Sequence, residues 1–185
     1  QELMFERVFG PIGISENDLT WRNNAYRDHK INGIMRREFG SGIHANVDAM
    51  ARIGYLYLRG GKWLVLRSGL RRVEKDQQLI PAEFVEMARQ VPKAVKGLPV
   101  VKPEDYFNAT DHYGLLWWNN ADGTMKDVPP DTYWSWGLYD SLIVVMPSLD
   151  IVASRAGKSL NKQGNAAYSA IEPFIGPIAM SVNDA

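Results

Sequence analysis

The strongest constraint on the fold is a pair of apolar runs on either side of a short turn. The runs are Leu142–Met146 and Ile151–Ser154, and the turn between them is Pro147–Asp150. Runs of this length, rich in valine and isoleucine and bounded by turn residues, predict two β-strands joined as a hairpin. The first run is almost continuously apolar, so we expect protein structure to cover both faces of its strand.

Large aromatic residues stand directly before this hairpin. Tyr133, Trp134 and Trp136 crowd around Gly137. A hairpin accounts for the apolar runs but not for three large aromatic side chains at its entrance. Packing in the core and lining of a binding pocket both agree with this pattern, and the sequence leaves the two interpretations open.

Helical patterns precede the strands. Apolar residues recur at 3.6-residue spacing along Asn46–Arg59, which predicts an amphipathic helix. A second helix is predicted from Pro81 to about Gln90, because proline is well tolerated in a first helical turn. On this second helix we expect Phe84, Met87 and Ala88 to face inward.

Other segments complete an α+β pattern. Gln1–Phe9 predicts the last turns of a helix that begins upstream, and Tyr113–Trp118 predicts a short strand. Asn165–Ile171 is expected to be helical and to end before Pro173. The charged stretch Ser68–Gln78 is interpreted as a solvated loop. Helices before and after a sheet in one chain indicate the α+β class.

Size and charge exclude several kinds of function. At 185 residues the chain is long enough for one domain with a sizeable core. Its 21 Lys and Arg balance 21 Asp and Glu, which gives no electrostatic basis for binding nucleic acid or an anionic membrane surface. No run of about 18 apolar residues predicts a membrane span. The absence of cysteine excludes disulfides and thiolate metal sites.

Several short motifs are too loose to define a site. Ser159–Lys162 matches S-x-x-K, a nucleophile motif, but lies in the polar connector after the last predicted strand. Tyr106–Asn108 matches Y-x-N among ordinary loop residues. His29, His44 and His112 are far apart and lack metal-ligand spacing, so we interpret them as loop residues and predict no metal or cofactor.

A set of weak motifs recurs in an order that resembles a known family. The motifs are Phe9–Gly13 (FGPIG), Asp48–Gly54 (DAMARIG), Gly60–Trp63 (GGKW), Ile80–Val85 (IPAEFV), Tyr113–Trp118 (YGLLWW), Tyr133–Gly137 (YWSWG) and the hairpin with Pro147 and Asp150 at its turn. Together they resemble serine hydrolases of the β-lactamase and penicillin-binding-protein type, nearest the class C β-lactamase and esterase branch. The resemblance covers the chain from about Phe5 to Gly157.

The resemblance implies that the nucleophile is outside this sequence. Members of the family attack an acyl carbonyl with the serine of S-x-x-K, assisted by Y-x-N, and both motifs precede the proline–apolar–glycine segment. That segment lies at Pro11 here, so the serine and its base would lie upstream of Gln1. The matches at Ser159 and Tyr106 fall after it, in the wrong order.

The same resemblance implies an architecture and a set of partners. The whole chain, 1–185, would be the C-terminal part of one β-lactamase-like domain with an antiparallel sheet flanked by helices. Residues 1–110 would be mainly helix and loop, and 111–185 the late strands and closing helix. The N-terminal half of the same protein would be its partner, together with a small ester, amide or peptide substrate. The location would be extracytoplasmic, that is, periplasmic or secreted.

Alignment with the family places candidate site residues before the hairpin. Counting back from Pro147 puts the family's third motif, a basic residue followed by Thr or Ser and Gly, on Thr132-Tyr133-Trp134. This sequence departs from the motif at all three positions, which argues against recognition of a β-lactam carboxylate.

Roles follow from these positions as expectations. The backbone N–H of Ser135 would help to form the oxyanion hole, and Tyr133 would donate a hydrogen bond to the substrate or leaving group. The remaining candidates would bind substrate, with the aromatic ones forming the wall of an acyl pocket: Thr132, Trp134, Trp136, Gly137 and Tyr139.

Three functions are compatible with this pattern. The first is hydrolysis of an ester or amide through an acyl-enzyme. The second is a non-catalytic member of the same fold that binds a peptide or cell-wall fragment. The third is a structural or assembly domain in which Trp134 and Trp136 are inaccessible core residues.

Overall fold

The centre of the molecule is a four-stranded antiparallel sheet. The computed structural model describes residues 2–23, 30–38, 40–64, 76–106, 108–160 and 168–182. Within them, the sheet has the strand order β10-β9-β8-β7. Its strands are β7 (Trp118–Asn119), β8 (Tyr133–Gly137), β9 (Ser141–Met146) and β10 (Ile151–Arg155). The predicted hairpin is confirmed, because Val152 pairs with Val145 and Arg155 with Leu142.

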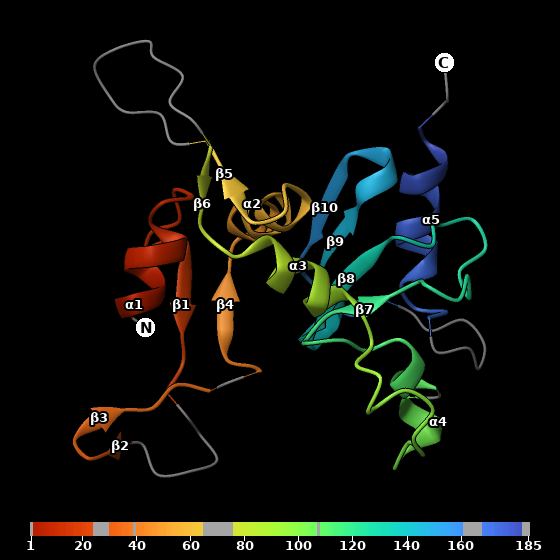
Figure 1. Cartoon of the computed structure of the whole chain (residues 1–185), viewed down its shortest axis with the longest axis horizontal. Coiled ribbons are helices and arrows are strands. Elements are labelled where there is room, and N and C mark those ends of the chain that lie inside the picture. Colours follow the sequence, from red (N-terminus) through yellow and green to blue (C-terminus); the bar gives the residue numbers. More distant parts are fainter. Residues whose placement is uncertain are drawn as a thin grey trace.

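Helices cover both faces of this sheet, which gives the α+β fold that the sequence predicts. Figure 1 shows α2 (Val47–Leu58) on one face of the sheet and α5 (Glu172–Met180) on the other. All five residues from Leu142 to Met146 are buried, so the prediction that both faces of this strand are covered is confirmed. Alternation along the strand assigns Leu142, Val144 and Met146 to the α5 side, and Ile143 and Val145 to the α2 side.

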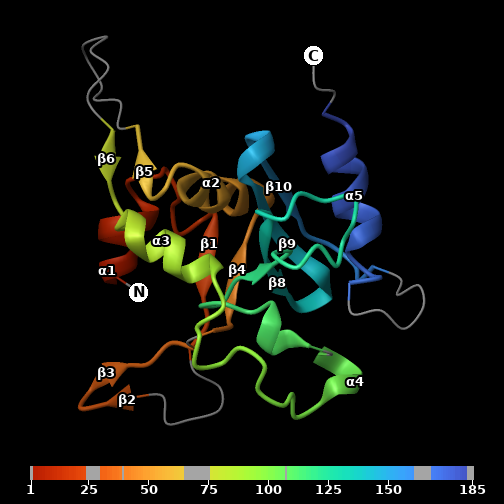
Figure 2. The same ribbon diagram turned by 45° about the vertical axis from the view of Figure 1, so that its right-hand side comes forward.

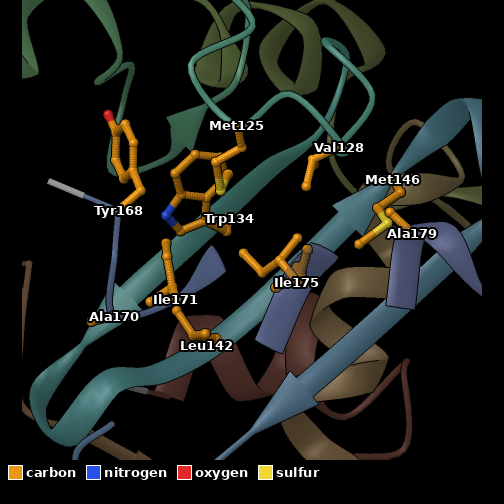
Figure 3. Packing of buried hydrophobic residues seen from close by; sticks show 11 residues of the cluster. Met125, Val128, Trp134, Leu142, Met146, Tyr168, Ala170, Ile171, Ile175 and Ala179 are labelled. Carbon is orange, nitrogen blue, oxygen red and sulfur yellow. The ribbon is translucent and has the colours of Figure 1, made fainter. Parts of the chain in front are cut away.

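The α5 side holds a core built around Trp134. Figure 3 shows this side chain among Met125, Tyr168, Ile171 and Ile175, with no exposed surface on Trp134 itself. Residues 168–171 form turns before the helix, and Pro173 lies in the first helical turn. The predicted helix over Asn165–Ile171 is therefore wrong where it is described. Proline begins a helix readily because its missing N–H would have no partner there.

The long helix α2 separates the sheet from the N-terminal part of the chain. The Asn46 side chain caps it by accepting the N–H of Ala49 at 2.8 Å. Gly54 faces the sheet, where an added Cβ would lie 2.6 Å from Val152 Cγ1 and 2.8 Å from Ile143 Cγ2. Glycine thus allows the helix to approach the sheet closely. The prediction of a helix over Asn46–Arg59 is confirmed.

The N-terminal part packs against the opposite side of α2. The helical segment predicted over Gln1–Phe9 is present as α1 (Glu2–Met4) and a π-helix (Phe5–Phe9). A second core joins Phe9, Ile12, Ile14 and Leu19 to Ala49 and Leu56 of α2. The motif arginine of α2 reaches this part of the chain, because Arg52 Nη1 donates to the Ile12 carbonyl at 3.1 Å.

Short strands complete the N-terminal part, and Figure 2 shows the β2–β3 hairpin extending away from the main body. β1 pairs with β4, β2 with β3 and β5 with β6, all antiparallel. Their bounds are β1 (Leu19–Trp21), β2 (Lys30–Ile31), β3 (Ile34–Met35), β4 (Ile43–Ala45), β5 (Lys62–Trp63) and β6 (Gln77–Gln78).

The remaining helices lie between β6 and β7. They are α3 (Ala82–Arg89), α4 (Pro103–Tyr106) and a 3₁₀ turn (Ala109–Asp111). The helix predicted from Pro81 is confirmed. Of the residues predicted to face inward, Ala88 is buried, whereas Phe84 and Met87 are exposed. Val85, which is not predicted to face inward, is buried.

The segment Tyr113–Trp117 forms a tight loop and not the predicted strand, and only Trp118, at the start of β7, is in a strand. Leu116 has a positive φ of 66°, and Tyr113 and Trp118 bridge to each other. Most of the predicted solvated loop Ser68–Gln78 lies outside the described residues. Among those that are described, no helix has the length and apolar character needed to cross a bilayer.

Candidate functional site

The predicted site residues lie along β8 and the turn that follows it, but they differ widely in exposure. Thr132, Tyr133 and Trp134 are buried, Ser135 and Trp136 are half-buried, and Gly137 and Tyr139 are exposed. Alternation along the strand sends Tyr133 to the α2 face and Trp134 to the α5 face. The aromatic residues before the hairpin therefore do not form one continuous wall.

On the α2 face, Tyr133 is held between aromatic and cationic groups. Its ring meets that of Trp117 edge-on at 5.2 Å, and the Arg89 guanidinium carbon lies 5.9 Å from its centre. Burial raises the pKa of the Tyr133 hydroxyl well above its ordinary value, so this group is a neutral phenol at physiological pH. It can donate a hydrogen bond, as the predicted role requires.

On the α5 face, aromatic rings pack around Tyr168. The rings of His112, Trp118, Trp134 and Trp136 lie 5.3–6.4 Å from that of Tyr168. Trp134 is fully buried, and its indole N–H has no hydrogen-bond partner among the residues that the structure describes. This burial is what the core interpretation of the aromatic cluster requires of Trp134. Trp136 is only half-buried and remains accessible from solvent.

The turn after β8 combines exposed side chains with left-handed backbone. Leu138 and Tyr139 are 77% and 61% exposed, and Tyr139 and Asp140 have φ values of 58° and 54°. Left-handed conformation is uncommon for a bulky residue and points to a position that the surroundings enforce. The 3₁₀ turn Leu138–Asp140 then leads directly into β9.

Asp140 fixes this turn and is a residue that sequence reasoning missed. Its carboxylate accepts the Trp136 indole N–H and the Leu160 backbone N–H, each at 2.8 Å. Arg155 in β10 donates to the Asp140 carbonyl at 2.7 Å and to the Tyr139 carbonyl at 3.2 Å. Acidic residues are common in turns, so the sequence carries no signal for this network.

One hydrogen bond determines which way the backbone of β8 points. In an antiparallel pair, successive residues direct their N–H and C=O groups to opposite neighbours. Asn120, directly after β7, donates its N–H to the Thr132 carbonyl at 3.0 Å. Even-numbered residues of β8 therefore face β7, and odd-numbered residues face β9. The bond of 3.2 Å from the Ile143 N–H to Ser135 Oγ agrees with this assignment.

Trp136 consequently has its backbone groups on an open edge. β7 pairs with Tyr133 and Trp134, and β8 continues beyond it. Within the described ranges, no strand pairs with β8 at Trp136 on that side. The Ser135 backbone instead faces β9. The backbone N–H directed to the open edge is therefore that of Trp136 and not that of Ser135, the predicted oxyanion donor, one residue away.

A cleft of about 310 Å³ lies at the other end of β8, between the C-terminal end of α3 and the start of the strand. Its walls include Glu86, Arg89, Lys96, Asp111 and Tyr133. The Asn119 amide donates to the Arg89 carbonyl at 3.0 Å and so joins α3 to the sheet. Among the sequence-predicted site residues, Tyr133 is the one that the structure brings to this cleft.

His112 lies in a turn, as the sequence indicates, but its side chain belongs to the core. It is fully buried, with Nδ1 3.3 Å from the Asn119 carbonyl oxygen and Nε2 3.2 Å from Asp122 Oδ2. The geometry at Nε2 does not make a hydrogen bond with any of the described residues. Within the described residues, no group of three or more His, Cys, Asp or Glu side chains could hold a metal ion.

The two weak motif matches give no competing site. Ser159 is exposed, and the lysine of its S-x-x-K match lies outside the described residues, as does His29. Tyr106 is 53% exposed at the end of the short α4 helix. No protein-family model matches the chain, and a search of curated proteins gave no match either.

Proposed function

We propose that this chain forms one wall of the active site of a serine hydrolase that cleaves an ester or amide through an acyl-enzyme. The observation that carries the proposal is the open edge of β8 at Trp136, beside an exposed turn. The nucleophile would come from the upstream part of the protein. The motif order described above supports the family, and the α+β fold agrees with it.

The chain's own groups would act on the carbonyl of the substrate. Attack by the upstream serine converts the carbonyl oxygen into an oxyanion, and the Trp136 backbone N–H donates a hydrogen bond to it. One such donor is worth about 3–4 kcal/mol in the transition state. The indole of Trp136 is fixed by Asp140, which holds this part of the strand in place before substrate binds.

Specificity would come from the turn rather than from the buried tryptophan. Leu138 and Tyr139 present apolar surface next to Trp136, and they would contact the acyl or leaving group. Trp134 is enclosed by the α5 core and would support the strand from behind. A neutral, apolar or aromatic ester is therefore the substrate class that fits best.

A peptide-binding protein of the same fold is the second candidate. A free strand edge can pair with an extended peptide through main-chain hydrogen bonds, and the Trp136 edge provides one N–H and one carbonyl for this. Such a protein would use the same edge without a nucleophile. The two candidates differ in covalent chemistry, which a probe can detect.

Labelling with a serine-directed phosphonate separates the hydrolase from the binder. We expect the full-length polypeptide to gain one phosphonyl group, and mass spectrometry to place it on an upstream serine. The 185-residue chain alone should remain unmodified. Labelling of the isolated chain at Ser159 would overturn the upstream assignment, and an unlabelled full-length protein would favour the binder.

Substitution of Trp136 tests the oxyanion donor. In the full-length polypeptide, Trp136→Pro removes the backbone N–H, and we expect kcat for an aryl ester to fall on the order of a hundredfold or more. Proline is tolerated where a strand N–H faces an open edge, so the sheet should survive. Trp136→Ala loses the same ring but keeps the N–H, and it is the matched control.

The activities of the two Trp136 variants are compared only if both keep the circular dichroism spectrum of the parent. If the Trp136→Ala variant keeps most of the activity and the Trp136→Pro variant loses it, the backbone N–H acts as the oxyanion donor. Equal activity of the two variants would show that the N–H takes no part. Loss of activity in both, to the same extent, would assign the effect to the indole instead.

A further inference from the structure

We propose that the cleft beside α3 binds a small zwitterion, such as a dipeptide with a free amine and a free carboxylate. This inference is independent of acyl hydrolysis and concerns the opposite end of β8. The volume of about 310 Å³ lies at the lower end of the range for small-molecule sites. Two cationic and three acidic side chains line the cleft, so it offers partners for both charges.

Arg89 is held in position for a carboxylate. The Glu86 carboxylate binds it from the same helix, with 2.6 Å from Oε2 to Nη2 and 2.8 Å from Oε2 to Nε. The face of Tyr133 contacts it from the strand at 5.9 Å. A guanidinium carries five N–H donors, so these contacts leave donors for a ligand. Prior fixation lowers the entropic cost of binding.

Lys96 adds a second cation to the lining of the cleft, and it is exposed. No carboxylate among the described residues forms an ion pair with it. The fixed guanidinium of Arg89 and the exposed ammonium of Lys96 each favour binding of a ligand carboxylate in the cleft. The intrinsic pairing of Arg with carboxylate is bidentate and directional, which would orient the ligand.

The acidic side chains differ in availability. Glu86 is paired with Arg89, and Asp131 accepts the Ser148 N–H at 2.8 Å and the Ser148 hydroxyl at 2.9 Å. Asp111 has no hydrogen-bond or ion-pair partner for its carboxylate in the part of the chain that the structure describes. A ligand ammonium would therefore bind at Asp111, and its carboxylate at Arg89 or Lys96.

Glycylglycine is the probe that tests this arrangement on the 185-residue chain. We expect calorimetry to give a dissociation constant on the order of 1 mM or lower. Amide NMR shifts should change around Arg89 and Asn119. Acetylglycylglycine lacks the amine and glycylglycinamide lacks the carboxylate, and each should bind about tenfold more weakly, which corresponds to about 1.4 kcal/mol.

Single variants assign each charge to its partner. Lys96→Gln should reduce the preference for glycylglycine over glycylglycinamide, and Asp111→Asn should remove the preference over acetylglycylglycine. Lys93→Gln changes an exposed lysine of the same connector that does not line the cleft, and it should bind like the parent. Absence of binding, equal binding of all three probes to the parent, or shifts confined to another surface would overturn the proposal.

Discussion

At the scale of single residues, Gly54 tests how closely α2 packs on the sheet. A Cβ at this position would lie within 2.6 Å of Val152 and 2.8 Å of Ile143, both of them packed side chains. Overpacking costs about 1–3 kcal/mol. The higher helix propensity of alanine stabilises the helix by up to about 1 kcal/mol. We expect Gly54→Ala to lower the free energy of unfolding by about 1–2 kcal/mol in urea titrations.

Gly176 in α5 is the matched control for this substitution. Its built Cβ meets no atom within 4 Å apart from its chain neighbours, so alanine there overpacks no distant part of the core. Pro177 follows and disfavours helical backbone for a preceding residue that carries a Cβ, which offsets the gain in helix propensity. Gly176→Ala should therefore change the free energy of unfolding by less than about 1 kcal/mol. Equal effects of the two substitutions would mean that α2 does not depend on a close approach to the sheet.

The candidate oxyanion donor shows why site residues are hard to place from a sequence. The sequence predicts Ser135, whereas the strand directs the backbone of Trp136 to the open edge. The side of a strand alternates with every residue, so an uncertainty of one position exchanges the two edges. The alternation is set by the bond between Asn120 and Thr132, which no local pattern encodes.

At the scale of elements, the apolar pattern is sufficient to predict the hairpin from its two runs and α2 from its 3.6-residue spacing. β9 is buried on both faces, and its apolar run has no alternating polar positions that would suggest a solvent-exposed face. Segments with mixed composition were harder. Tyr113–Trp118 is as aromatic as a strand, but Gly114 and the left-handed Leu116 turn it back on itself. Strand propensity describes packing on a sheet and does not resist such a turn.

The inward face of α3 could not be deduced from its spacing. Phe84 and Met87 are the larger apolar residues, but the helix is short and lies at the surface with Val85 and Ala88 against the body. Over eight residues the apolar positions allow more than one face. The inward face is fixed by contacts with a loop that is distant in the sequence. In this loop, the backbone N–H of Leu115 donates to the Ala88 carbonyl at 2.9 Å.

At the scale of the whole molecule, buried tyrosines make stability depend on alkaline pH. Burial raises the pKa of Tyr57, Tyr113, Tyr133 and Tyr168 above the ordinary value of 10.0. Above about pH 10 the unfolded chain releases these protons while the folded chain keeps them. The contribution of these tyrosines to the free energy of unfolding should therefore be constant below this pH and fall above it.

The pH dependence of the free energy of unfolding can be measured directly. Each such tyrosine contributes at most about 1.4 kcal/mol per pH unit between its unfolded and folded pKa. Urea midpoints across the alkaline range should decrease reversibly, with recovery on return to neutral pH. A double variant, Tyr133→Phe and Tyr168→Phe, should show a shallower decrease. A midpoint that stays constant above pH 10 in the parent would contradict the burial of these hydroxyl groups.

The aromatic packing on the α5 side also has an optical consequence. The rings of Trp118 and Trp136 lie 5.9 Å apart at an angle of 69°, and Trp136 is bound to the turn through Asp140. Indole transitions at such a distance and inclination couple, so the pair should give a paired positive and negative band in circular dichroism. That band depends on the relative orientation of two strands. The protein thus contains an intrinsic reporter of the geometry at the open edge of β8, which a substrate or peptide at that edge would alter without any added label.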